Sequence, residues 1–90
     1  MQKLSVLLYT FVPDIVERRA PHRDAHLTLL RELHAEGDCV MGGALGDPPT
    51  GAAIVFTSPE AAEHFAAVDP YIAAGLVVSH QIEPWTVAVP

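Results

Sequence analysis

The order of strand-like and helix-like segments constrains the fold of this chain more than any other feature of its sequence. Runs rich in aliphatic, aromatic and β-branched residues predict strands over residues 4–11, 39–45, 52–57 and 77–87. Apolar stripes at helical spacing predict helices over residues 21–36 and 59–69. This β-α-β-β-α-β order is typical of the ferredoxin-like arrangement, an antiparallel four-stranded sheet with two helices on one face. The sequence therefore predicts an α+β fold, and ninety residues leave room for one domain, residues 1–90.

Prolines, glycines and a serine mark the ends of these segments. Pro21 suits the first turn of the longer helix, and Gly37 follows its end, where a left-handed cap needs a residue without a side chain. Ser58 offers a hydroxyl N-cap to the second helix. The turn formers of residues 46–51 predict a hairpin loop between the second and third strands. Two further helical turns are expected, one capped by Asp14 and one over residues 71–75.

The apolar content predicts a homodimer. Half of the residues are hydrophobic and only 18% are charged, which is more apolar material than a small monomer can hide. Because both helices lie on one face of the predicted sheet, the other face is left bare. A second copy would cover that face. The strand residues expected to supply the surplus are Val6, Leu8, Ile54, Phe56, Val78 and Ile82.

Charge and hydropathy exclude other partners. Five basic and eleven acidic residues give a net charge of −6, and a surface of that sign repels phosphate backbones. We therefore expect no nucleic-acid partner. The sequence shows neither a signal-peptide pattern nor an apolar run of the roughly 20 residues that cross a bilayer, so no membrane association is expected. The single cysteine, Cys39, excludes an internal disulfide and fits a reducing cytoplasm.

One histidine lies where a polar ring needs a partner. His26 precedes Leu29, Leu30 and Leu33 by three, four and seven positions, which places it on the inward stripe of the long helix. A buried ring without a hydrogen bond costs about 1–3 kcal/mol. Asp69, held extended at the exit of the second helix by the following proline, is the expected partner. A carboxylate that fixes one ring nitrogen leaves the other free to act as a base. The pair suits a structural histidine tied to a loop, and catalysis is the alternative.

The remaining polar residues allow weaker interpretations. His22 and His26 have the spacing of a metal pair, but no convincing third and fourth ligand accompanies them, so no metal and no cofactor are predicted. Positive charge gathers around the start of the helix that bears His26, from Arg18, Arg19 and Arg23, and an anionic ligand could bind there. Gly42-Gly43 favours a bulge, or a close approach of a ligand to the backbone. The other histidines are expected to lie near a helix C-terminus (His34), on the surface (His64) and at a buried or interface position (His80).

Several short motifs, in their order along the chain, resemble those of the YciI-like family. The runs that carry the resemblance are Arg23-Asp24-Ala25-His26-Leu27, Leu33-His34-Ala35-Glu36-Gly37, Gly42-Gly43, Asp69-Pro70-Tyr71-Ile72-Ala73-Ala74-Gly75 and Glu83-Pro84-Trp85. The resemblance implies a dimeric α+β barrel, formed when two ferredoxin-like sheets pack face to face. It also implies that His26 and Asp69 form an active-site dyad. One relative in this family eliminates chloride from a chlorinated hydroxyhydroquinone, and other members are accessory domains.

Three functions remain open from the sequence. The first is a cofactor-free lyase or isomerase for a small anionic or aromatic substrate, with His26 as general acid/base and Asp69 orienting it. In that hypothesis Arg23, the Gly43 backbone and Tyr71 contribute to substrate binding. The second is a metabolite-binding module without turnover, which uses the same dyad only for hydrogen bonding. The third is a structural or accessory dimer.

Overall fold

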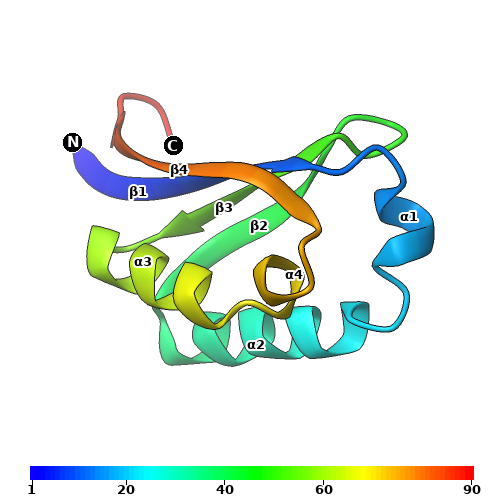
Figure 1. Ribbon diagram of the computed structural model, residues 1–90. Coiled ribbons are helices and arrows are strands. Elements are labelled where there is room, and N and C mark those ends of the chain that lie inside the picture. Colours follow the sequence, from blue (N-terminus) through cyan, green and yellow to red (C-terminus); the bar gives the residue numbers. More distant parts are fainter.

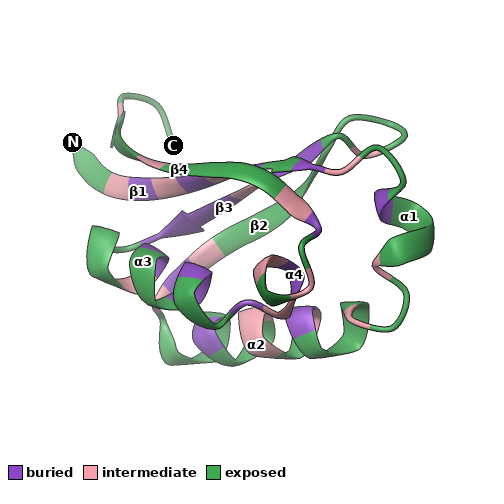
Figure 2. Cartoon of the chain, in the orientation of Figure 1, coloured by how far each residue is buried: buried purple, intermediate pink, exposed green.

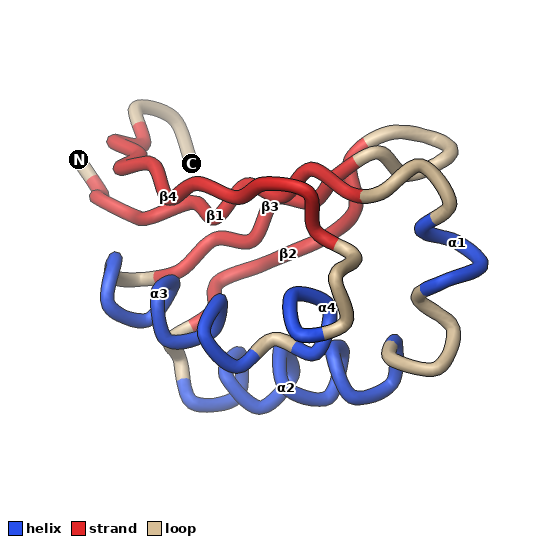
Figure 3. Tube along the Cα trace, in the orientation of Figure 1, coloured by secondary structure: helices blue, strands red, loops and turns tan.

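The strands and helices follow one another in the order that the sequence predicts. A computed structural model describes residues 1–90 (Figure 1). Its elements are β1 (Gln2–Phe11), α1 (Ile15–Arg18), α2 (Arg23–Glu36), β2 (Cys39–Leu45), β3 (Gly51–Phe56), α3 (Pro59–Val68), α4 (Pro70–Ala73) and β4 (Val77–Val87). The strands form one antiparallel sheet in the order β2-β3-β1-β4. Figure 3 shows α2, α3 and α4 gathered on one side of this sheet. The predicted α+β, ferredoxin-like fold is confirmed.

The helix ends differ in detail from the predicted ones. Helix α2 begins at Arg23, two residues after Pro21, and its N-cap residue His22 makes no capping hydrogen bond through its side chain. Asp14 does not cap α1 through its side chain and instead lies 3.6 Å from Arg18 in an exposed ion pair. Gly37 ends α2 in the left-handed region, with φ of 88°, as its lack of a side chain allows. None of the four helices combines the length and the apolar character needed to cross a membrane.

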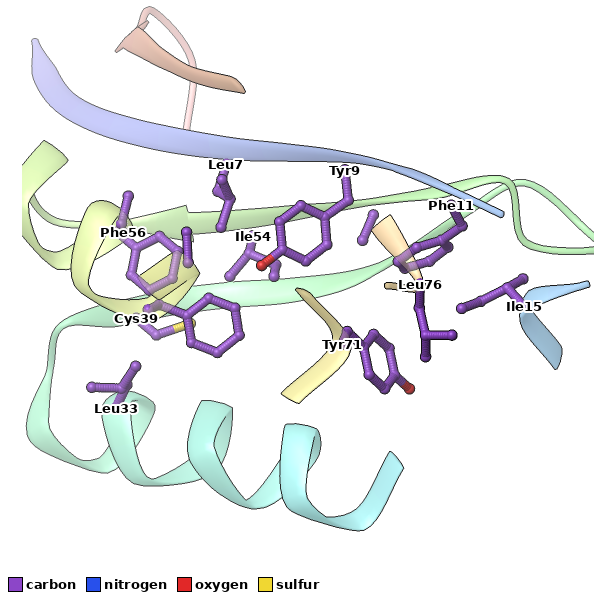
Figure 4. Close-up of a cluster of buried hydrophobic side chains, with 14 residues drawn as sticks. Leu7, Tyr9, Phe11, Ile15, Leu33, Cys39, Ile54, Phe56, Tyr71 and Leu76 are labelled. Carbon is purple, nitrogen blue, oxygen red and sulfur yellow. The ribbon is translucent and has the colours of Figure 1, made fainter. Parts of the chain in front are cut away.

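The core lies between the sheet and the three helices that cover it. Alternate residues of β1 and β3 point into this layer, where they meet apolar residues of α2 and α3 (Figure 4). Leu7, Phe56 and Phe65 are completely buried there. The side chain of Tyr9 extends from β1 into the same layer, and Tyr71 enters it from α4. This layer therefore holds the aromatic residues that will surround the site.

The opposite face of the sheet is open, but its residues are only partly the predicted ones. Ile54 and Phe56 pair with Leu7 and Ser5 on the helix-covered face, and they belong to the core. Ile82, which pairs with Leu7, shares that face, whereas Val78 falls at an irregularity of the β1–β4 pairing and is exposed. The apolar residues of the open face are Val6, Leu8, Met41, Leu45, Ala53, Val55 and Trp85. Figure 2 shows β2 and β4 as mostly exposed, whereas β3 is largely buried.

One further prediction fails at the edge of the sheet, and another is narrowed. The irregularity in β2 lies between Cys39 and Met41, and Gly42 and Gly43 are in regular register with β3, so the predicted glycine bulge is wrong. A Cβ at Gly42 would lie 3.2 Å from Cγ2 of Ile54, so any side chain there would require Ile54 to shift by a few tenths of an ångström. His80 is exposed in the single chain, with its ring 6.3 Å from that of Tyr9. Of its two predicted positions, the buried one is therefore wrong, and the interface one stays a prediction.

Candidate active site

His26 occupies the inner face of α2, where aromatic rings fix its orientation. The residue is 6% exposed. The Tyr71 ring stacks on the imidazole, with the centroids 3.7 Å apart and the planes 3° from parallel. Phe65 of α3 meets the ring edge-on at 5.9 Å. Two aromatic neighbours hold the plane of the imidazole ring in place.

Asp69 lies at the junction between α3 and α4 and serves both helices. It follows the last residue of α3 in extended conformation, as expected for a residue before proline, and its Oδ1 accepts the backbone N–H of Tyr71 at 3.1 Å. The same oxygen lies 2.7 Å from Nδ1 of His26. The residue is 1% exposed. The predicted pairing of His26 with Asp69 is therefore present in the structure.

Tyr9 completes the network, and it is the residue that sequence reasoning missed. Its hydroxyl donates to the second carboxylate oxygen of Asp69, Oδ2, at 2.7 Å. Burial, and then the hydrogen bond to this carboxylate, raise the pKa of Tyr9 far above its ordinary value, so the hydroxyl keeps its proton. A signal was available in the alternation of Ser5, Leu7, Tyr9 and Phe11 along β1. A tyrosine on a buried face must find a hydrogen-bond acceptor for its hydroxyl.

The network assigns the protons of the imidazole. An ionised carboxylate can only accept, so Nδ1 of His26 donates to Asp69, and in the neutral ring Nε2 then carries the lone pair. Every buried side-chain nitrogen or oxygen atom of the protein has a hydrogen-bond partner, whereas Nε2 of His26 has none within the chain. Nε2 is therefore not one of the buried atoms. Nε2 is consequently accessible, and an accessible nitrogen with a lone pair can take a proton from a bound molecule.

Replacing Tyr9 with phenylalanine tests this network. We expect a loss of about 1–3 kcal/mol in the free energy of unfolding at neutral pH, because Asp69 Oδ2 loses its only hydrogen bond in the chain. The raised pKa adds a pH effect. Above about pH 10 the unfolded chain releases the tyrosine proton and the folded chain retains it, so stability falls as the pH rises. Denaturant unfolding at neutral and alkaline pH measures both effects.

The stability of the variant should decline less at alkaline pH than that of the wild type, because Tyr9 no longer contributes. Some decline should remain, since burial also raises the pKa of Tyr71. Tyr9→Phe unfolding curves that match the wild type at both pH values would contradict the role given to this hydroxyl.

A cavity of about 150 Å³ lies beside His26. Arg23, Gly43 and Tyr71, the three predicted binding residues, line it together with His26. Asp69 does not line the cavity and lies behind the imidazole. Arg19 and Gly42 also contribute to the wall. Arg19 is one of the arginines expected near an anion, and Gly42 belongs to the glycine pair for which a bulge or a close approach of a ligand was expected. The apolar residues of the wall are Phe11, Leu27, Leu30, Ala44, Ala52 and Ile54.

The other histidines lie apart from the dyad. His34 Nδ1 is 2.9 Å from the carbonyl oxygen of Cys39, which ties the end of α2 to the start of β2. His64 is exposed on α3, as expected, and His22 is half-buried at the N-cap of α2. No three His, Cys, Asp or Glu side chains are arranged so that they could hold a metal ion. His26 and Asp69 therefore form a pair without a third metal-ligating side chain beside them.

Comparison with known proteins assigns the family. The YCII-related domain matches residues 4–86. The chain belongs to the YCII-related family. Protein YciI of Escherichia coli O6:H1 is 36% identical over 83 residues, which cover 80% of this chain and 85% of that protein. The YciI-like membership that the sequence motifs implied is confirmed.

Solved structures similar to this YCII-related chain share its fold. The 5-chloro-2-hydroxyhydroquinone dehydrochlorinase TftG of Burkholderia phenoliruptrix, in complex with 2,5-dihydroxybenzoquinone, is 25% identical with a TM-score of 0.74. The match covers 92% of this chain and 93% of TftG. A dimeric protein of ferredoxin-like fold from Bacteroides fragilis has a TM-score of 0.53 at 14% identity, covering 94% and 95% of the two chains. The similarity to the second structure shows the fold alone.

Proposed function

We propose that this YCII-related protein is a cofactor-free lyase or isomerase for a small anionic or aromatic substrate, with His26 as its general acid/base. One observation carries the proposal. Nδ1 of His26 is 2.7 Å from a buried carboxylate oxygen of Asp69, while the same ring lines a cavity. A histidine held by a carboxylate on one side and accessible on the other has the geometry of a positioned base.

The proposed mechanism assigns one task to each residue. Nε2 of His26 takes a proton from the substrate, and Asp69 stabilises the imidazolium that forms and holds the ring in place. Tyr71 covers one face of the imidazole and Arg23 offers positive charge at the wall, where a developing anion is stabilised. The Gly43 backbone borders the same space without a side chain. The proton then returns from His26 to the product or to the leaving group.

The size of the cavity limits the substrate. A volume of about 150 Å³ is below the roughly 300–1,000 Å³ of sites for drug-sized ligands, so a small molecule of about one ring is expected. The similarity to TftG, a dehydrochlorinase, supports an elimination in particular. Elimination of hydrogen chloride from a hydroxylated ring requires a base that takes the proton as chloride leaves, and it requires no redox cofactor.

Turnover assays with hydroxylated aromatic acids and halogenated hydroquinones test the proposal. Release of chloride, or a change in the absorption spectrum of the ring, reports an elimination or isomerisation by the wild-type protein. Binding of these compounds without conversion would contradict the enzyme proposal and support a metabolite-binding module. Detection of neither binding nor conversion of these compounds would support the third hypothesis, a structural or accessory role for the dimer.

We further propose that the protein works as a homodimer in which the open face of the sheet is covered by a second copy. Met41 is 62% exposed and Trp85 is 45% exposed on this face, and together with Val6 and Val55 they line a depression of about 540 Å³. An apolar surface of this extent usually marks an interface. Packing of two such faces produces a dimeric α+β barrel.

Sedimentation or light scattering should give about twice the chain mass of 9.7 kDa. Met41→Glu would bury a charge in the apolar interface, at a cost of several kcal/mol, and should shift the protein to the monomer. Val68→Glu is the matched control, because Val68 is 47% exposed on α3, on the other side of the sheet. A wild-type monomer at micromolar concentration would overturn the dimer, as would equal behaviour of the two variants.

A further inference from the structure

The charge around the cavity is opposite to that of the chain as a whole. The sequence has eleven acidic and five basic residues, yet two arginines and no carboxylate line the cavity beside His26. The two are Arg19, which follows α1, and Arg23, which begins α2. A surface that concentrates positive charge at one hollow of an acidic protein attracts anions to that hollow.

Neither guanidinium is neutralised by the protein. The ion pairs of the chain join Arg18 to Asp14 and His26 to Asp69, and Arg19 and Arg23 take part in none. Both arginines lie close enough to the Tyr71 hydroxyl to lower its pKa, against the larger effect of burial, which raises it. The Tyr71 hydroxyl thus lies near two arginines that form no ion pair, and the Tyr71 ring stacks on the imidazole of His26.

Helix α2 arranges the cavity wall from charged to apolar. Arg23, His26, Leu27 and Leu30 have the i, i+3, i+4 and i+7 spacing of one helical face, and all four line the cavity. Arg23 therefore lies about one turn before His26 and Leu30 about one turn after it. The N-cap residue His22 makes no capping hydrogen bond with its side chain, so the positive end of this 14-residue helix adds to the charge of Arg23.

We propose that Arg19 and Arg23 form a carboxylate-binding end of the cavity, and that the ligand is a small organic acid whose apolar body lies toward Leu27 and Leu30. The guanidinium fork matches a carboxylate in two-point contact. The small volume favours a carboxylate over a larger phosphorylated metabolite. Calling the acid a substrate rests on the proposed function. The carboxylate site itself does not, because it should bind small organic acids whether or not the protein converts them.

Titration calorimetry with matched acids and amides tests this inference. The probes are para-hydroxybenzoate against para-hydroxybenzamide, and butyrate against butyramide, which differ in charge and hardly in size. The proteins are the wild type, Arg19→Gln, Arg23→Gln and the control Arg18→Gln, whose guanidinium pairs with Asp14 outside the cavity. Melting curves of each variant verify that the fold is retained.

We expect at least one acid to bind the wild type about tenfold or more tightly than its amide, and each cavity variant to lose about tenfold in affinity for that acid. Arg18→Gln should bind like the wild type, and added salt should weaken only the acids. Equal binding of acid and amide, equal affinity in all four proteins, or binding of no acid at all would overturn the carboxylate site. So would binding of inorganic phosphate by a wild-type protein that binds neither acid.

These results are separable from the fate of the enzyme proposal. Arginine-dependent binding of acids without any turnover supports the carboxylate site and contradicts the enzyme proposal. Conversion of halogenated hydroquinones that needs His26, by a protein that binds no acid more tightly than its amide, supports the enzyme proposal and overturns the carboxylate site.

Discussion

Replacing His26 with asparagine is expected to lower turnover by a factor of about 10²–10⁴, the usual contribution of a positioned acid or base. The amide nitrogen of asparagine lies near the position of Nδ1, so a donor to Asp69 Oδ1 is retained. The variant lacks Nε2, the nitrogen that has no partner in the chain. Chemistry is therefore removed while the hydrogen bond inside the protein is kept. Steady-state rates on a substrate found in the turnover screen measure the loss.

His64→Asn is the matched control, because His64 is exposed on α3 and belongs to no network. It should retain wild-type rates. The pH profile gives a second measurement: the limb of kcat that reports a base should be present in the wild type and in His64→Asn, and absent from the residual activity of His26→Asn. Wild-type rates in the His26 variant, with this limb preserved, would contradict a catalytic role and leave only the structural one.

Replacing Asp69 with alanine should have the largest effect on stability. The carboxylate accepts three hydrogen bonds, from the Tyr9 hydroxyl, from His26 and from the Tyr71 backbone. Its removal leaves three buried donors without a partner and removes the N-cap of α4. We expect the free energy of unfolding to fall by about 3–5 kcal/mol, a large part of the total for a domain of this size. Denaturant unfolding measures the change.

Glu63→Ala on α3 provides the comparison, since it removes an exposed carboxylate and should change stability by less than about 0.5 kcal/mol. Asp69→Asn keeps the side-chain shape and separates the two roles of the carboxylate. It should cost less stability than the alanine variant and still lower turnover by about 10² or more, because an amide cannot fix the ring tautomer and stabilise the imidazolium as the carboxylate does. An alanine variant as stable as the wild type would show that the carboxylate is not what joins β1, α2 and α4.

The caps at Ser58 and Gly37 and the partner of His26 could be predicted because each depends on residues close in sequence or on a strict chemical need. Ser58 accepts the N–H of Ala61 at 3.1 Å, as an N-cap hydroxyl does. A histidine on an apolar helix stripe requires a partner, and a buried aspartate at a helix exit requires donors, so the two were matched across 43 positions. Periodicity within a helix places a residue on a face without any knowledge of its neighbours.

Sheet faces and the wall of the cavity could not be read in the same way. A shift of one residue in register moves every side chain of a strand to the other face, and the irregularities beside Val40 and Phe11 make such shifts. Ile54 and Phe56 were assigned to the bare face, although the pairing of β3 with β1 places them with Leu7 and Ser5 in the core. The sequence likewise could not tell which of Arg18, Arg19 and Arg23 would reach the site. The path of the chain between α1 and α2 decides this, because it directs Arg19 to the cavity and Arg18 to Asp14.

The sequence by itself determined the order of the elements, the caps at Gly37 and Ser58 and the pairing of His26 with Asp69, because these follow from local backbone preferences and from the cost of burying an unpaired polar group. The tertiary structure alone decided that Tyr9 shares the carboxylate and that Tyr71 stacks on the imidazole. Tyr9 and Asp69 are 60 positions apart, and the register of β1 against its neighbours brings them together. Contacts of this kind depend on how strands and helices pack, which periodicity within one segment does not contain.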